Sequence, residues 1–205
     1  MKDLQKDELC RRMYRDLLPN IADYVALYAK ERPKDTAIIE HNTGATVTWK
    51  QFDTSVNAFA AKLLSIGLVK GDIVATSLPL LKEHIYLIYA CYRIGLIVAP
   101  LDLRLKAGEI ITCMQKMKPK AYFFLGKTPV VDFRPTIREV MAACPGIRHW
   151  VQFQKEADQI MEGAVGVAEF TRDIKKVYLL NLLTGRVKKA RHIVGKRDAC
   201  LIIFT

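Results

Sequence analysis

The sequence lacks the cysteine patterns that build disulfide frameworks and metal sites. Its five cysteines are odd in number and widely spaced, none belongs to a Cys-x-x-Cys pair, and none stands near a histidine at metal-ligand spacing. This argues against a disulfide-stapled secreted fold and against a zinc module, so no metal ligands are expected. Free and mostly buried thiols in a reducing cytoplasm fit best. The five are Cys10, Cys91, Cys113, Cys144 and Cys200.

Long apolar runs are also missing. Residues 1–18 mix both signs of charge and have no apolar core, which argues against a signal peptide. The most tempting stretch, residues 85–101, is only 17 residues long and carries Arg93 near its middle and Pro100 near its end. That length is short for a membrane span, and a charge inside one is costly. We therefore predict a helix that leads into a buried strand, and no membrane span.

Acidic side chains are scarce near the C-terminus, and the formal net charge of +11, which is high, is therefore unevenly placed along the chain. Residues 181–205 hold six basic side chains and one acid, Asp198. The basic run 186–197 has the charge of a patch for nucleic acid or an acidic membrane. It contains no interleaved aromatic residues and no recognisable nucleic-acid motif. We predict a solvated linker here, and no nucleic-acid partner.

Helical and strand-like patterns alternate from residue 20 onward, which predicts βαβ units and a largely parallel sheet, an α/β fold. Residues 1–19 are expected to form a helical extension ahead of the domain, and residues 155–197 to form loops around short elements. The expected helices cover residues 20–31, 48–66, 82–94, 107–118 and 134–143. The expected strands cover residues 37–40, 45–47, 73–78, 96–100, 121–125, 149–153 and 199–204.

Structural roles explain the pattern of residues 44–75 completely, and none of these residues needs a catalytic role. Thr48 and Gln51 form a capping box at the start of an amphipathic helix, and Gly67 ends that helix. A Gly-Asp turn then leads into a buried strand, and we expect Asp72 in this turn to hydrogen-bond the local backbone.

The order and spacing of three phrases resemble the AMP-forming acyl-CoA synthetase family. This adenylate-forming group includes fatty-acid and aryl-acid CoA ligases, luciferases and the adenylation domains of peptide synthetases. The resemblance covers about residues 20–130 and 198–205. The phrases are the helix start Thr48-Trp49-x-Gln51-Phe52, the turn Gly67…Lys70-Gly71-Asp72…Val74-Ala75, and Gly95…Pro100-Leu101-Asp102.

The resemblance also implies a role for the last residues of the chain. In the family, an apolar strand like residues 199–204 runs into Ser-Gly-Thr-Thr-Gly-x-Pro-Lys, a loop that wraps the ATP phosphates with backbone N–H groups, hydroxyls and a lysine. Thr205 matches the first threonine of that loop and is the one cofactor-binding residue that the resemblance assigns. Residues 20–205 would then be an incomplete N-terminal AMP-binding domain, cut just before its phosphate loop.

The resemblance implies a two-step ligase reaction for the complete enzyme. A carboxylic acid reacts with ATP to give an acyl-adenylate and pyrophosphate, and coenzyme A then displaces AMP to give a thioester. ATP, Mg²⁺ and coenzyme A are the implied cofactors and substrates of the complete enzyme. The phrase 99-APLDLRLKAGEI-110 favours the acyl-CoA ligase branch. For the 205-residue chain alone we expect no catalytic residues, no bound cofactor and no ligase activity.

The remaining candidate residues have plainer explanations. The four histidines are isolated in sequence and are expected to be solvent-facing or satisfied in the core. Asp102 is expected to cap a loop, and Arg104 and Lys106 to be solvated charges, although a contact with a phosphate of coenzyme A is an alternative. Cys91 and Cys113 are expected to pack among apolar neighbours. The histidines are His41, His84, His149 and His192.

Two other classes of function stay open. A short chain with this scaffold could be a non-catalytic binding or interaction module. A nucleic-acid-binding protein is a third possibility, resting on net charge alone, and it would require binding with a steep dependence on salt.

Overall fold

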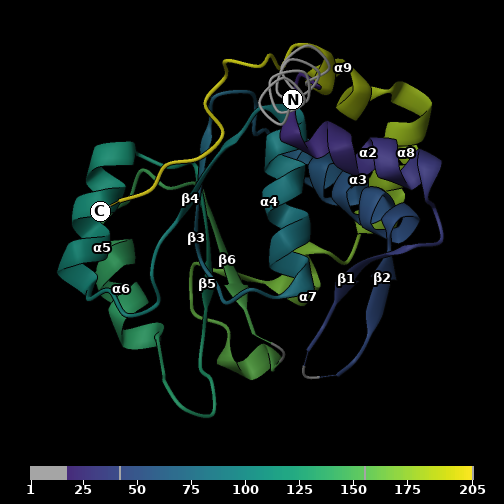
Figure 1. The fold of residues 1–205 in the computed structure, drawn as a ribbon. Coiled ribbons are helices and arrows are strands. Elements are labelled where there is room, and N and C mark those ends of the chain that lie inside the picture. The colour runs from purple at the N-terminus through teal and green to yellow at the C-terminus, as the bar shows by residue number, and fades with distance from the viewer. Residues whose placement is uncertain (1–17, 42, 155, 205) are drawn as a thin grey trace, which may run out of the picture.

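The computed structural model describes residues 18–41, 43–154 and 156–204, and these form a parallel sheet with helices on both faces (Figure 1). Within the described residues the sheet has five strands in the order β4-β3-β5-β6-β7, and each neighbouring pair is parallel. The predicted α/β class and parallel sheet are confirmed. The strands are β3 (Ile73–Ser77), β4 (Ile97–Pro100), β5 (Ala121–Leu125), β6 (His149–Phe153) and β7 (Val165–Gly166).

One face of the sheet is covered by α5 (Ala107–Met117) and α6 (Arg134–Ala143), which lie to the left of the sheet in Figure 1. Tyr122 and Phe124 of β5 point to this face and pack with apolar residues of the two helices. Phe123 of β5 points to the opposite face and joins the other half of the core. Burial on both sides is why β5 is an unbroken apolar run and not an alternating one.

The second face is covered by a larger set of helices. They are α2 (Ile21–Glu31), α3 (Trp49–Ser65), α4 (Lys82–Ile94), α7 (Val167–Phe170), α8 (Ile174–Thr184) and α9 (Arg186–His192). The predicted capping box of α3 is confirmed, because Thr48 Oγ accepts from the Gln51 N–H and Gln51 Oε1 accepts from the Thr48 N–H. Before α3, β1 (Thr36–Ile39) and β2 (Thr46–Thr48) form a separate antiparallel hairpin.

The charge inside the apolar stretch, Arg93, holds three helices together. Its side chain is almost fully buried, and its Nη1 lies 2.8 Å from Oδ1 of Asp53 on α3. Its Nη2 donates to the carbonyl of Ala22 on α2 at 2.9 Å. The stretch is a packed helix followed by β4, as predicted. Within the described residues, no helix has both the length and the apolar character needed to cross a membrane.

Two predictions near the C-terminus are wrong. Residues 155–197 hold η1 (Ala157–Gln159) and the helices α7, α8 and α9, so the basic run is not a linker but begins as helix α9. Residues 199–204 do not form a full strand. In this segment, Leu201 makes an isolated parallel bridge to Val98, and Leu201 and Ile203 are 42% and 66% exposed.

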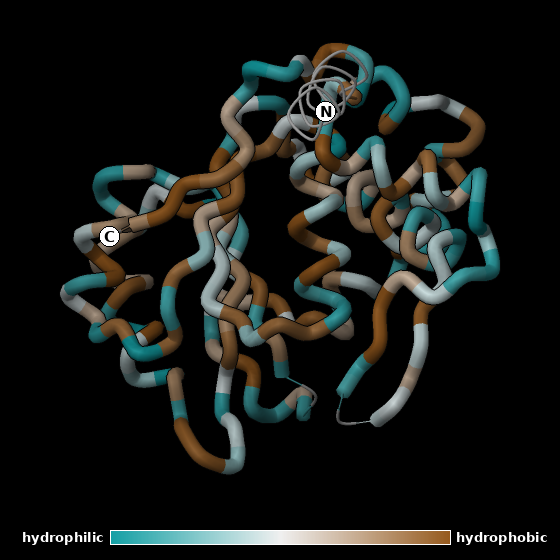
Figure 2. Tube along the Cα trace, viewed as in Figure 1, coloured by the Kyte–Doolittle hydropathy of each residue, from teal (hydrophilic) through white to brown (hydrophobic). Residues whose placement is uncertain are grey.

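The C-terminal segment still follows the sheet. Figure 2 shows it as an apolar stretch that runs beside β4. A central strand of a sheet forms hydrogen bonds with a neighbouring strand along each of its two edges. Within the described residues, the C-terminal segment pairs with β4 along one edge only. The predicted N-terminal extension falls largely on residues 1–17, which lie outside the described residues.

Candidate functional site

The carboxyl ends of β3, β4, β5 and β6 meet at one edge of the sheet, because these strands are parallel. Open α/β sheets place their sites at this edge. Polar side chains gather there from each strand or from the residues that follow it. They are Thr76 and Ser77, Asp102, Tyr122, and Gln152 and Gln154.

His84 is bound at this edge through both of its ring nitrogens. Nδ1 lies 3.0 Å from the carbonyl of Pro79, and Nε2 lies 3.0 Å from Oγ1 of Thr76. Because a carbonyl can only accept, Nδ1 carries the proton, and Nε2 accepts from the Thr76 hydroxyl. Burial lowers the pKa of His84, which favours this neutral form.

A histidine beside a hydroxyl resembles the general base and nucleophile of a hydrolase. Here, however, His84 and Thr76 are both too deeply buried for a substrate to reach them. Thr76 is fully buried and His84 is 4% exposed. The expectation of a satisfied core histidine is therefore confirmed at His84. His41 and His192 are exposed, and His149 is half-buried at the start of β6.

A small cavity of about 140 Å³ lies between β3, β5 and α6. The hydroxyls of Ser77 and Tyr122 are 2.7 Å apart at its wall, and Phe124 and Phe133 add apolar surface. Burial raises the pKa of Tyr122 above its usual range, so the phenol stays protonated. No local sequence pattern indicates this pair, because Ser77 and Tyr122 lie 45 residues apart in the chain.

Asp102, at the mouth of the same cavity, closes a local turn. Its Oδ1 accepts from the backbone N–H of Arg104 at 2.8 Å, and its Oδ2 lies 2.6 Å from Arg104 Nη2. The hydrogen bonds from Arg104 lower the pKa of Asp102 to about 2. The predicted loop role of Asp102 is confirmed. The side chain of Arg104 is 90% exposed, as expected for a solvated charge.

A glutamine network fixes the ends of β5 and β6. Gln152 donates from Nε2 to the carbonyl of Gln159 and accepts through Oε1 from the N–H of Met161. Gln154 Oε1 accepts from the Lys127 N–H at 2.7 Å. A Cβ on Gly126 would lie 2.1 Å from Gln152 Nε2 and 2.4 Å from Gln154 Oε1, so a larger residue would force the amide ends of the two glutamines to shift. No local sequence pattern indicates this network, because its hydrogen bonds join Gln152 and Gln154 to residues up to 27 positions away.

The C-terminal segment approaches this edge from the open side of β4. The Val98 N–H donates to the carbonyl of Cys200, and the Ile202 N–H donates to the carbonyl of Val98, each at 2.9 Å. Ile202 and Phe204 pack against the core on the α5 side. Thr205, the predicted phosphate-loop residue, lies outside the described residues.

The other predicted residues lie where the sequence suggested. Asp72 Oδ2 accepts from the backbone N–H of Val69 at 2.9 Å, which confirms its role in the turn. Cys91 is buried in the core on the α4 side of the sheet, and Cys113 is partly buried against the core on the α5 side. Cys91, Cys113, Cys144 and Cys200 are free thiols. The part of the chain that the structure describes holds no cluster of three or more histidine, cysteine or acidic residues that could bind a metal ion.

Several known proteins are similar to this chain in sequence. A family model described as AMP-binding enzyme matches residues 25–205. The long-chain-fatty-acid–CoA ligase FadD13 of Mycobacterium tuberculosis (strain H37Rv) is 27% identical over 149 residues, which are 72% of this chain and 29% of the ligase. The acetyl-coenzyme A synthetase of Yersinia pseudotuberculosis (serotype I) is 37% identical over 155 residues, which are 70% of this chain and 24% of the synthetase.

Solved structures share the fold. A crystal structure of the anthranilate CoA ligase AuaEII in complex with anthranoyl-AMP matches with a TM-score of 0.66 at 18% identity, over 79% of this chain and 29% of the ligase. A Mycobacterium tuberculosis fatty acyl CoA synthetase matches with a TM-score of 0.62 at 19% identity, over 91% of this chain and 32% of the synthetase. The chain spans between 2% and 30% of the length of the curated relatives it matches. With the parallel sheet, the three phrases and a family match over most of its residues, the chain belongs to the AMP-binding enzyme family.

Proposed function

We propose that this chain is the N-terminal part of an AMP-forming carboxylic acid–CoA ligase. The observation that carries the proposal is the match of the AMP-binding enzyme family model over residues 25–205. The direction of the C-terminal segment supports it. Because residues 200–202 run parallel to β4, a chain continuing from them would leave at the carboxyl edge of the sheet, where α/β proteins hold ligands.

The proposed reaction has two steps. The carboxylate of the acid attacks the α-phosphorus of ATP, pyrophosphate leaves, and an acyl-adenylate remains. The thiol of coenzyme A then attacks the acyl carbon and AMP leaves, which gives the acyl-CoA. ATP, coenzyme A and the acid are the proposed small-molecule partners, and Mg²⁺ would screen the charge on the phosphates.

The described residues supply structure for this reaction and not its catalytic groups. His84, Thr76, Tyr122 and Ser77 are satisfied by one another or by backbone, and Asp102 is held by Arg104. These residues offer no fitted site for Mg²⁺ or phosphate, so we assign no step to them. Thr205 is proposed as the first residue of the phosphate loop, and residues 20–205 as the first part of the AMP-binding domain. The 205-residue chain alone is proposed to be inactive.

A reducing compartment such as the cytoplasm is proposed as the location. The four cysteines among the described residues are unpaired, and Cys200 is exposed, which suits a compartment that keeps thiols reduced.

The test is pyrophosphate release from ATP and Mg²⁺ with a panel of fatty, aromatic and short carboxylic acids. Two proteins are compared, the 205-residue chain and the product of the same reading frame continued past Thr205. We expect acid-dependent pyrophosphate release, followed by thioester formation with coenzyme A, from the longer protein alone. Release by the 205-residue chain would overturn its assignment as an inactive part, and no release by a folded longer protein with any acid would count against the ligase.

A further inference from the structure

Helix α8 carries apolar side chains around its whole circumference, although only half of it is covered. Ile174 and Val177 pack against the core on the α3 side. The outer half presents four leucines to solvent, and a helix that is apolar on all sides is normally buried. The leucines are Leu179, Leu180, Leu182 and Leu183, with exposed fractions of 60%, 52%, 60% and 87%.

Polar contacts fix α8 with its leucines outward. Asp173, just before the helix, lies 2.6 Å from Lys62 Nζ on α3. Gly185 ends α8 in the left-handed conformation, at φ +65°, and starts α9 directly. Asn181 Oδ1 on the inner side of α8 accepts from the Val187 N–H at 2.8 Å, which ties the two helices together. The leucines cannot turn inward without breaking these contacts.

Basic side chains surround the leucines, and the segment that carries both contains no acid of its own. Residues 174–197 contain eight lysines and arginines and no aspartate or glutamate. Lys175 and Lys176 are exposed on α8, and Lys188 and Lys189 are exposed on α9. We call this surface, the exposed side chains of α8 and α9, the α8–α9 face.

Three aspartates that flank or contact this region already form ion pairs. Asp173 pairs with Lys62, and Asp198 pairs with Lys70. Asp23 is buried and pairs with Arg191. The α8–α9 face therefore combines protruding leucines with uncompensated positive charge.

We propose that the α8–α9 face attaches the protein to the surface of an anionic lipid bilayer. Leucines would enter the boundary between headgroups and acyl chains while the flanking lysines contact lipid phosphates, as in amphipathic surface helices. A second copy of this chain is a poorer occupant, because it would bring two acid-free basic surfaces together. The proposal goes beyond the ligase and does not depend on it.

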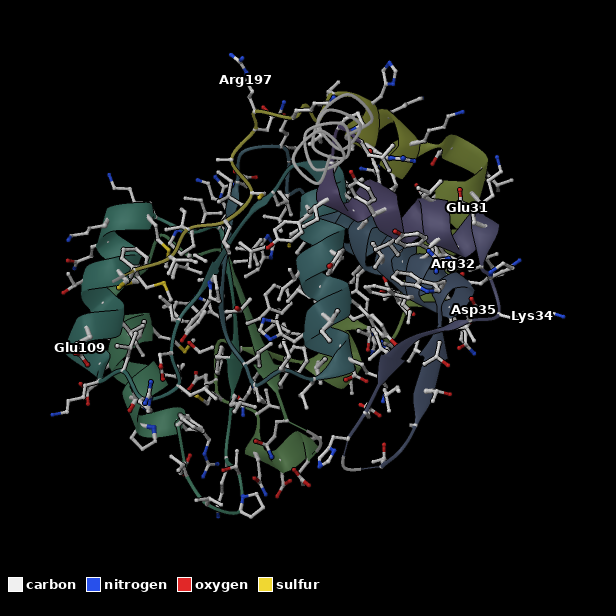
Figure 3. All side chains as sticks on the ribbon, viewed as in Figure 1. Glu31, Arg32, Lys34, Asp35, Glu109 and Arg197 are labelled. Carbon is white, nitrogen blue, oxygen red and sulfur yellow. The ribbon has the colours of Figure 1, made fainter. Side chains whose placement is uncertain are left out.

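The position of the α8–α9 face would let the protein bind a bilayer while the carboxyl edge of the sheet stays accessible. Figure 1 shows α8 and α9 on the opposite side of the molecule from α5, α6 and the C-terminal end. In Figure 3, Arg197 projects outward from the connection between α9 and the C-terminal segment, which extends the basic surface past α9.

The test is sedimentation of the full chain with vesicles of phosphatidylcholine alone or of equimolar phosphatidylcholine and phosphatidylglycerol. We expect binding to the anionic vesicles only, weakening as salt is added. L179Q/L183Q should reduce the partition coefficient at least about tenfold, because two leucines lose their apolar insertion. K188E/K189E should reduce it at least about thirtyfold, because two attractive charges are reversed.

Two matched variants control for general changes of the surface. K116E/K127E makes the same change in net charge at exposed positions on α5 and in the loop after β5. V130Q/V131Q removes exposed apolar side chains from the same loop. Both should bind anionic vesicles like the parent chain. Circular dichroism and the thermal midpoint verify that each variant is folded.

Three outcomes would overturn the proposal. The first is equal sedimentation with neutral and anionic vesicles, or none with either. The second is binding that the control variants weaken as much as the α8–α9 variants do. The third is a dimer in light scattering that L179Q/L183Q dissolves while vesicle binding is absent, which would assign the face to a second copy.

Discussion

Leu201 pairs in parallel with Val98 across the open edge of β4. The bridge rests on two backbone hydrogen bonds of Val98, one to the carbonyl of Cys200 and one from the N–H of Ile202. This pairing gives the C-terminal segment the direction of the sheet's strands. It connects the fold with the proposed function, because the segment then points to the edge where α/β proteins hold their ligands.

The ion pair between Arg93 and Asp53 is predicted to be the most sensitive charged contact in the helical layer. Arg93→Met should lower the free energy of unfolding by about 3 kcal/mol, because Asp53 loses its buried partner while its own side chain stays 24% exposed. Urea unfolding measures the loss. The same substitution in the exposed pair, Arg104→Met, should cause no measurable change. Equal effects of the two substitutions would contradict the role given to Arg93.

Gly126 is predicted to be required where β5 and β6 end. Gly126→Ala places a Cβ 2.1 Å from Gln152 Nε2 and 2.4 Å from Gln154 Oε1, so it should destabilise the fold by about 1–3 kcal/mol. The control is Gly146→Ala, where a Cβ meets nothing within 4 Å. The thermal midpoint should fall for the first variant and stay nearly unchanged for the second. A neutral Gly126→Ala would show that the glutamine network rearranges freely.

The capping box of α3 is predicted to contribute measurably to stability. Thr48→Ala removes the hydroxyl that accepts from the Gln51 N–H and should cost about 1 kcal/mol. Thr54→Ala is the matched control on the same helix, because the Thr54 hydroxyl is exposed and bonds only the carbonyl of Lys50 among the described contacts. A loss at Thr54 as large as the loss at Thr48 would argue against the cap.

His84 is predicted to make stability depend on pH near neutrality. Burial lowers its pKa below the ordinary value of 6.5, so the unfolded chain binds a proton on acidification before the folded chain does. The free energy of unfolding should therefore fall as the pH drops through 6.5 and level off once the folded-state pKa is passed. Burial lowers the pKa of His149 too, which acts in the same direction.

The measurement is urea unfolding of the parent chain and of His84→Phe between about pH 7.5 and about pH 5.5, one unit on each side of the ordinary histidine pKa of 6.5. The variant removes the titrating group, so its stability should vary less with pH. An unchanged slope would mean that His84 titrates alike in the folded and unfolded chains.

Much of the fold could be predicted because its signals are local. The capping box at Thr48 lies within four residues, and continuous apolar strands such as β5 identify a sheet buried on both faces. Arg93 inside an apolar stretch could also have been recognised as part of a buried pair, since a buried charge needs a partner. The sequence did not identify that partner as Asp53, 40 residues earlier.

The C-terminal third was harder to predict for physical reasons. Helix α8 is apolar on its outer half as well as its inner half, so it lacks the period that marks a surface helix. Residues 199–204 have the composition of a central strand, but within the described residues they pair only with β4. The contacts of Gln152 and Tyr122 at the carboxyl edge depend on the register of the sheet, which no local pattern encodes.

The most direct test of the central claim is to read the coding DNA past the codon for Thr205. The proposed ligase predicts that Ser-Gly-Thr-Thr-Gly follows, completing a phosphate loop at the carboxyl edge of the sheet. A stop codon at that point, or a continuation without a glycine- and hydroxyl-rich loop, would contradict the claim that this chain is the N-terminal part of an acid–CoA ligase.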